Sequence, residues 1–214
     1  MIFRTVFLAL MLGLFLPQLQ AAPAVSAYRT EVILVAYKKS EEIDHQLWPK
    51  TLDTSILMSN STDANNSKPP LQPLSQNAPL LLTNEAARIN QMRDMKVIWH
   101  QAWIENLEEN GKPILHPVNV HLTDKFDIYL TGNVSVSRNR YLHFNSNLIM
   151  QHAKLQKSPA YAENMTGNEE SDNDTHIRAA HIELSRKMRS GELHYIDHPM
   201  LGVIVKVVPV NAAP

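Results

Sequence analysis

The sequence contains no cysteine, only six glycines and few aromatic residues, which make up 7% of its 214 residues. The lack of cysteine excludes disulfides, a thiol nucleophile, thiolate metal sites and the lipid anchor of a bacterial lipoprotein. The glycines form no glycine-rich run, so a phosphate-binding loop is excluded as well. The formal net charge of −1 offers no excess of basic residues of the kind that nucleic-acid binding requires.

One long apolar stretch lies at the N-terminus. Residues 1–4 are weakly basic, residues 5–16 are apolar, and Pro17 and several small residues follow. This pattern is typical of a cleavable secretory signal peptide, and the stretch is too short to span a membrane as a helix. We predict a signal peptide at residues 1–22, with cleavage between 21 and 27, and an exported mature protein without a membrane span. The alternative is an uncleaved anchor helix.

The remaining sequence predicts one domain of class α+β. Apolar residues make up 44% of the chain, which is typical of a globular protein. Turn signals join most successive strands, so we expect a mainly antiparallel sheet of about seven strands with one or two short helices. Alternating or short apolar runs predict strands near 28–37, 95–105, 118–122, 127–137, 141–150, 177–188, 192–196 and 201–208.

Three other segments lack the alternation of strands. Residues 84–94 have apolar positions at helical spacing, with Thr83 as the expected N-cap of a short helix. Residues 52–80 are rich in Ser, Asn, Thr and Pro, and residues 157–175 are polar and acidic. We predict flexible loops for both, inside a single domain that spans 28–209.

Aromatic and basic residues provide the best candidates for ligand binding. Trp99 and Trp103 share a strand face with Val97 and Gln101 if the strand is regular, and such rings can stack on sugars or belong to the core. Basic residues at 138, 140, 186, 187 and 189 accompany two tyrosines, a mixture that suits a ligand with sugars and carboxylates. The candidate binding residues are Trp99, Trp103, Arg140, Tyr141, Arg189, His194 and Tyr195.

Histidines near the C-terminus raise the alternative of a metal-dependent hydrolase that uses His194, Asp197 and His198. On a strand, positions 194 and 198 share a face but lie about 13 Å apart. Hydrogen bonds that shape the turn before Pro199 explain these residues more simply. No Gly-x-Ser-x-Gly motif is present, so we expect no catalytic residue, no metal and no cofactor.

A series of short motifs also resembles the CsiV family. The resemblance covers about residues 28–209 and is most specific at 188–202. The motifs are Tyr28-x-x-Glu31-Val-Ile, Trp48-Pro49, Val97-x-Trp-His-Gln-x-Trp103, Gly132-x-Val, Arg140-Tyr-Leu-His143 and Met188-Arg-Ser-Gly-Glu-Leu-His-Tyr-Ile-Asp-His-Pro-x-x-Gly202.

The resemblance implies a non-catalytic, periplasmic peptidoglycan-binding protein of gammaproteobacteria that supports cell-wall synthesis and cell shape. It further implies two partners, an outer-membrane lipoprotein activator and the class A penicillin-binding protein that this lipoprotein activates. It supplies no binding residues, so the candidates above rest on their residue types alone. A purely structural partner of an envelope complex is a third interpretation.

Overall fold

A computed structural model describes residues 26–38, 48–49, 52, 74, 78–123, 126–154 and 177–210. The predicted signal peptide, the predicted loop at 157–175 and most of the predicted loop at 52–80 lie outside the described residues. In the described part of the chain, no helix is long and apolar enough to cross a membrane.

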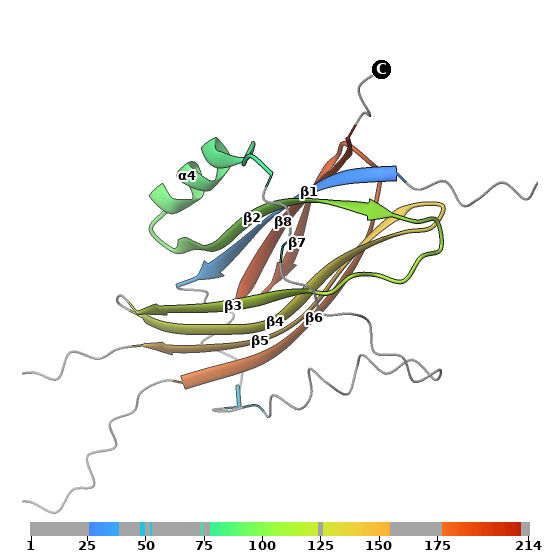
Figure 1. The fold of residues 1–214 in the computed structure, drawn as a ribbon. Coiled ribbons are helices and arrows are strands. Elements are labelled where there is room, and N and C mark those ends of the chain that lie inside the picture. Colours follow the sequence, from blue (N-terminus) through green and yellow to red (C-terminus); the bar gives the residue numbers. More distant parts are fainter. Residues whose placement is uncertain are drawn as a thin grey trace, which may run out of the picture.

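The described strands form two four-stranded antiparallel sheets that pack face to face (Figure 1). The first sheet has the order β2-β1-β8-β7 and consists of β1 (Ser26–Tyr37), β2 (Met95–Leu107), β7 (Leu193–His198) and β8 (Leu201–Pro209). The second sheet has the order β3-β4-β5-β6 and consists of β3 (His116–Thr123), β4 (Phe126–Arg138), β5 (Leu142–Lys154) and β6 (Ile177–Met188). Helix α4 (Thr83–Gln91) covers part of the outer face of the first sheet.

The predicted fold class is confirmed, since the structure is a single, mostly antiparallel β domain with one short helix among the described residues. The described residues contain eight strands rather than about seven. They divide into two layers because consecutive hairpins build the second sheet, whereas β1 lies between β2 and β8. A strand near the start of the domain therefore pairs with the last described strand.

The main core lies between the two sheets. Alternate residues of each strand point inward, so Ile128, Leu130, Val134 and Val136 of β4 are all buried, as their spacing predicts. Burying an aliphatic side chain of this size contributes about 1.5–3 kcal/mol. A smaller cluster on the other face of the first sheet joins α4 to the strands and contains Ile33, Val35, Leu82 and Ala86.

A bulge in β2 places Val97 on the face of the sheet opposite to the one predicted. The register with β1 shifts between Leu34 and Val35, so that Leu34 pairs with Trp99 and Val35 pairs with Val97. The extra residue reverses the alternation, because two residues of β2 then lie opposite one of β1. Val97 packs against the α4 cluster, whereas Trp99 packs against the main core. The prediction that both share a face is therefore wrong.

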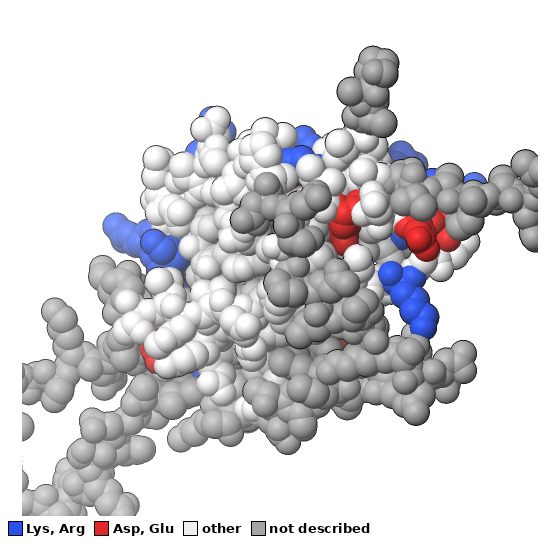
Figure 2. Space-filling model, in the orientation of Figure 1, with Lys and Arg blue, Asp and Glu red and all other residues white. Residues whose placement is uncertain are grey.

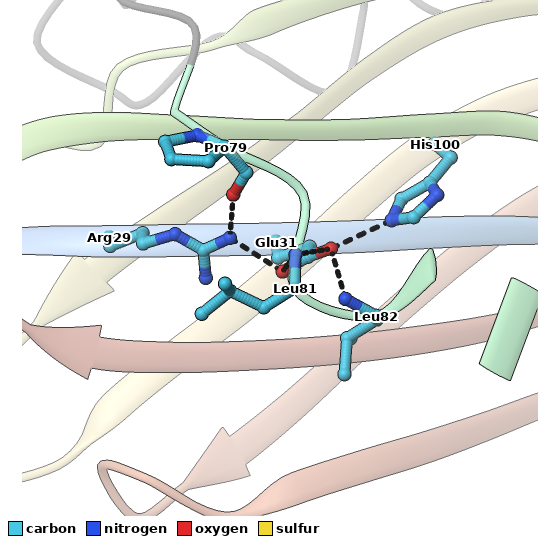
Figure 3. A network of polar contacts seen from close by, with 6 residues as sticks. All are labelled: Arg29, Glu31, Pro79, Leu81, Leu82 and His100. Carbon is cyan, nitrogen blue, oxygen red and sulfur yellow. Dashed lines mark hydrogen bonds and ion pairs between the residues drawn. The ribbon is translucent and has the colours of Figure 1, made fainter. Parts of the chain in front are cut away.

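The buried carboxylate of Glu31 holds the segment before α4 (Figure 3). Its Oε1 accepts a hydrogen bond from the N–H of Leu82 at 2.9 Å, and Leu81 donates its N–H to the same carboxylate. Arg29 lies at 2.7 Å and also donates to the Pro79 carbonyl. The N-cap position is Leu82, so the prediction that Thr83 caps the helix is wrong. The Glu31 carboxylate from β1 instead accepts the N–H of this N-cap residue, one of the four N–H groups that a helix N-terminus leaves without an intrahelical partner.

Candidate functional site

Five basic residues that the sequence singled out meet at one end of the sandwich. Strand pairing aligns Leu142 with both Arg138 and Met188, which places the β4–β5 turn beside the end of β6. This end lies away from α4, and both basic and acidic groups are visible there (Figures 1 and 2). We call the following set the basic end: Arg138, Arg140, Arg186, Lys187 and Arg189. Nearby turns contribute Glu108, Glu109 and Glu192, so the cations are in excess.

Tyr141 is the aromatic centre of the basic end. The ammonium nitrogen of Lys187 lies 3.7 Å from the centroid of its ring, and the guanidinium carbon of Arg140 lies 5.7 Å from it. A cation over a ring face is attracted by the electron density of the ring. Tyr141 therefore positions two cations at the surface. A sugar that stacked on this ring would have to share it with Lys187.

A hollow of about 340 Å³ adjoins the basic end. Its lining includes Glu108, Lys112 and Arg138 together with the apolar Leu107 and Ile114. Gly111, which also lines it, follows the turn at Asn110, a residue with a φ of 59°. A hollow with both charge signs and apolar walls suits a ligand that carries carboxylates beside short aliphatic groups.

Neither candidate tryptophan belongs to the basic end. Trp103 is 1% exposed, and its indole N–H donates to Glu105 at 2.8 Å. Trp99 is partly buried, packs against the main core and lies 6.4 Å from Trp103 between ring centroids. A ring as buried as that of Trp103 cannot stack on a sugar without unpacking the core, so we correct its predicted role to that of a core residue.

Tyr195 is the most accessible aromatic candidate, with 53% of its surface exposed. Its hydroxyl contacts that of Tyr37, and both hydroxyls donate to the Asp197 carboxylate, at 2.9 Å from Tyr195 and 2.7 Å from Tyr37. Burial, followed by the contacts with Tyr195 and Asp197, raises the pKa of Tyr37. A Cβ at Gly202 would approach the Tyr37 hydroxyl to 2.7 Å, so glycine leaves room for this cluster. The cluster joins β7 to β1 across β8.

His194, Asp197 and His198 do not converge. Burial alternates along β7, where Ile196 packs against the main core and shares its face with the two histidines. His194 lies 3.5 Å from Glu192, and the ring of His198 lies 6.1 Å from that of Trp48. The carboxylate of Asp197 points to the other face and is shared by two tyrosines. Within the described residues, no group of three His, Asp or Glu side chains is placed to hold a metal.

The candidate residues therefore occupy three places. Arg140, Tyr141 and Arg189 belong to the basic end, while Trp103 belongs to the core and the partly buried Trp99 packs against it. On β7, His194 faces inward and Tyr195 faces outward. Sequence reasoning missed Tyr37, because only the pairing of β1, β8 and β7 brings it to Tyr195 and Asp197.

Comparison with protein families finds a match over residues 5–210 to the family described as "Peptidoglycan-binding protein, CsiV". The match covers almost the whole sequence. No curated protein and no solved structure matches the chain.

Proposed function

Because the chain belongs to the CsiV family of peptidoglycan-binding proteins, we propose that it binds peptidoglycan without catalysis and that the basic end is one of its contact surfaces. The family match carries the proposal. The family is described by what it binds rather than by a reaction. The chemistry of the basic end supports the assignment of the surface.

Peptidoglycan combines sugar chains with short peptides that bear carboxylates. Arg140 in the β4–β5 turn, Lys187 at the end of β6 and Arg189 in the turn after it are exposed and lie at one end of the second sheet, so they can meet several carboxylates at once. Each such exposed ion pair contributes only about 0.2–1 kcal/mol, and the binding is weakened by salt. Avidity on a polymeric wall compensates for weak single contacts.

A pulldown with purified sacculi tests the proposal. The protein should sediment with the sacculi at low salt and should be released progressively as the ionic strength rises. Recovery in the supernatant at every salt concentration would refute wall binding. If crosslinking in cells then still showed envelope partners, the protein would be a structural partner instead.

Charge removal tests the assigned surface. Replacing Arg140, Lys187 and Arg189 together by glutamine should weaken sacculus binding about tenfold. The matched control replaces Arg88, Arg93 and Lys96 by glutamine as well. These residues lie on or beside α4 at the other end of the sandwich, so this variant should retain binding. Equal losses in the two triple variants would mean that net charge acts alone, and the basic end would not be a site.

The finer proposal concerns location and partners. We propose export by the signal peptide at residues 1–22 into the periplasm, and assistance there to the lipoprotein activator of a class A penicillin-binding protein. The support is the N-terminal apolar pattern and the family resemblance of the motifs. N-terminal sequencing of the protein from a periplasmic fraction should find a start between residues 22 and 28. Crosslinking in cells should capture the lipoprotein, and its absence would refute the partner.

A further inference from the structure

The outer face of the second sheet carries an unusual set of residues on its two central strands. The outward positions of β4 and β5 alternate with the core positions and pair with one another across the strands. Among them Tyr129 is exposed, Ser135 and Ile149 are buried between their neighbours, and the others are half-buried. We call them the polar strip: Tyr129, Thr131, Asn133, Ser135 and Ser137 on β4, with His143, Asn145, Asn147, Ile149 and Gln151 on β5. None of these ten residues is Asp, Glu, Lys or Arg.

The composition of the polar strip conflicts with strand propensity. Asparagine is depleted in strands, yet Asn133, Asn145 and Asn147 lie in the middle of the two central strands. An outer sheet face needs polar residues, but threonine, lysine or glutamate would serve that need. Residues with a low propensity for the secondary structure in which they lie are expected mainly at functional sites. The strip is therefore better explained by a ligand than by contact with water alone.

A groove of about 450 Å³ lies at the end of the strip farther from the basic end. Its wall contains Tyr129, which is 45% exposed, and His121, whose ring stacks on that of Tyr129 at 3.9 Å between centroids. Asp127 accepts a hydrogen bond from His121 at 2.9 Å, and this bond lowers the pKa of Asp127. The aromatic wall is thus fixed in place, and an ordered ring loses little entropy when a ligand stacks on it.

The groove and strip offer hydrogen-bonding groups that are already oriented. Thr131 donates to the Oδ1 of Asn119 at 2.9 Å, and His181 lies 2.7 Å from the Oδ1 of Asn147. Both amide oxygens are engaged within the sheet, so the amide NH₂ groups face away from these partners as donors. Hydroxyl and N-acetyl groups of a sugar can accept such bonds, while its ring C–H groups pack on an aromatic face.

We propose that the polar strip and its groove bind the uncharged N-acetylated glycan of the wall, with Tyr129 as the stacking residue. This inference rests on the proposed function and names the part of peptidoglycan that the second sheet recognises. The strip has no charged residue of its own, and the charged residues beside Tyr129 and Asn147 are the acidic Asp127 and Glu183, which favours the sugar chain over peptides that bear carboxylates. The strip spans nine residues from Tyr129 to Ser137, about 26 Å, and then meets Lys187, which pairs with His143. Peptide carboxylates would reach the basic end while the glycan lies along the strip.

Titration with the tetramer of N-acetylglucosamine, which has no peptide and no charge, tests whether the polar strip and its groove bind glycan. Backbone amide shifts in NMR spectra should change along β4 and β5 and should saturate. Tyr129→Ala should weaken tetramer binding about fivefold, and Tyr129→Phe, which keeps the ring, should bind like the wild type. The matched control is Leu193→Ala, an equally accessible residue on the first sheet at 52% exposure, which should change nothing. Thermal unfolding of each variant verifies folding.

Sacculus sedimentation of the same variants separates the two proposals. In one outcome, the wild type sediments with sacculi but fails to bind the tetramer, and in another it shows shifts only at the basic end. Either result would refute the glycan site without refuting the proposed function. Equal binding by Tyr129→Ala and the wild type would overturn the glycan site as well. Failure of the wild type to sediment would overturn both.

Discussion

Replacing Glu31 by alanine should destabilise the protein severely. Glu31 is fully buried, and its carboxylate contacts the Arg29 guanidinium at 2.7 Å, the His100 ring at 2.8 Å and the Leu82 N–H at 2.9 Å. Its removal leaves a buried guanidinium without its carboxylate. Breaking one side of a buried ion pair costs about 3–5 kcal/mol, and an unsatisfied buried N–H costs about 1–3 kcal/mol. Because these contacts share one carboxylate, the costs do not add, and we expect a loss of about 4 kcal/mol.

Urea unfolding measures this loss as a lower midpoint with an unchanged slope. Glu31→Gln keeps the size of the side chain and one acceptor, so its loss should be smaller, about 2 kcal/mol. The control Glu108→Ala removes an exposed glutamate and should lie within about 0.5 kcal/mol of the wild type. A loss below about 1 kcal/mol for Glu31→Ala would show that the network contributes little, and the reasoning would be refuted.

The same carboxylate predicts a dependence on pH. Burial alone raises the pKa of Glu31, but hydrogen bonds from Leu82, Arg29, His100 and Leu81 outweigh it and leave the pKa below its ordinary value of 4.5. The unfolded chain therefore takes up a proton at a higher pH than the folded protein. The contribution of Glu31 is complete above the ordinary pKa and is lost as pH falls through the folded value. The stability of Glu31→Gln should fall less steeply below about pH 4.5.

Two further outcomes follow from positions in the second sheet. Burial, with a smaller effect of Arg178, lowers the pKa of His152 from 6.5 to about 4, so the unfolded chain binds the proton first as pH falls. Stability should drop by about 3 kcal/mol between pH 6.5 and 4, and His152→Leu should flatten that slope in urea midpoints. Gly132 has a φ of 143°, and a Cβ there would lie 2.1 Å from the Asn147 carbonyl, so Gly132→Ala should cost more than about 3 kcal/mol in urea unfolding. Gly191→Ala, at a φ of 86° in open space, is the control and should cost only about 1 kcal/mol.

Local periodicity predicted the elements of the fold well, because alternation along a strand depends only on which side faces the core. Ala180, Ile182 and Met188 of β6 are buried as expected from their spacing. Periodicity carries no information on which strands become neighbours. Nothing in the sequence near β1 indicates that Tyr28 pairs with Pro209, so the division into two sheets could not be predicted.

The candidate site was predicted unevenly for related reasons. The basic end could be foreseen, since Arg140 and Lys187 come from segments rich in basic residues and a turn signal joins β4 to β5. The burial of Trp103 depends on the second sheet packing above β2, which no local pattern reveals. The polar strip was missed because outward asparagines and serines resemble an ordinary solvated face when each strand is considered alone.

The pairing of β1 with β8 has a consequence for the order in which the protein folds. The second sheet consists of three consecutive hairpin pairs, so it can form as soon as residue 188 has been made. The first sheet cannot, because β1 lacks one neighbour until residues 201–209 arrive, more than 160 positions later. Closing so long a loop is entropically costly and slows folding. A nascent chain would thus stay incompletely folded until its last described strand emerges, because the first sheet lacks one of its central strands until then.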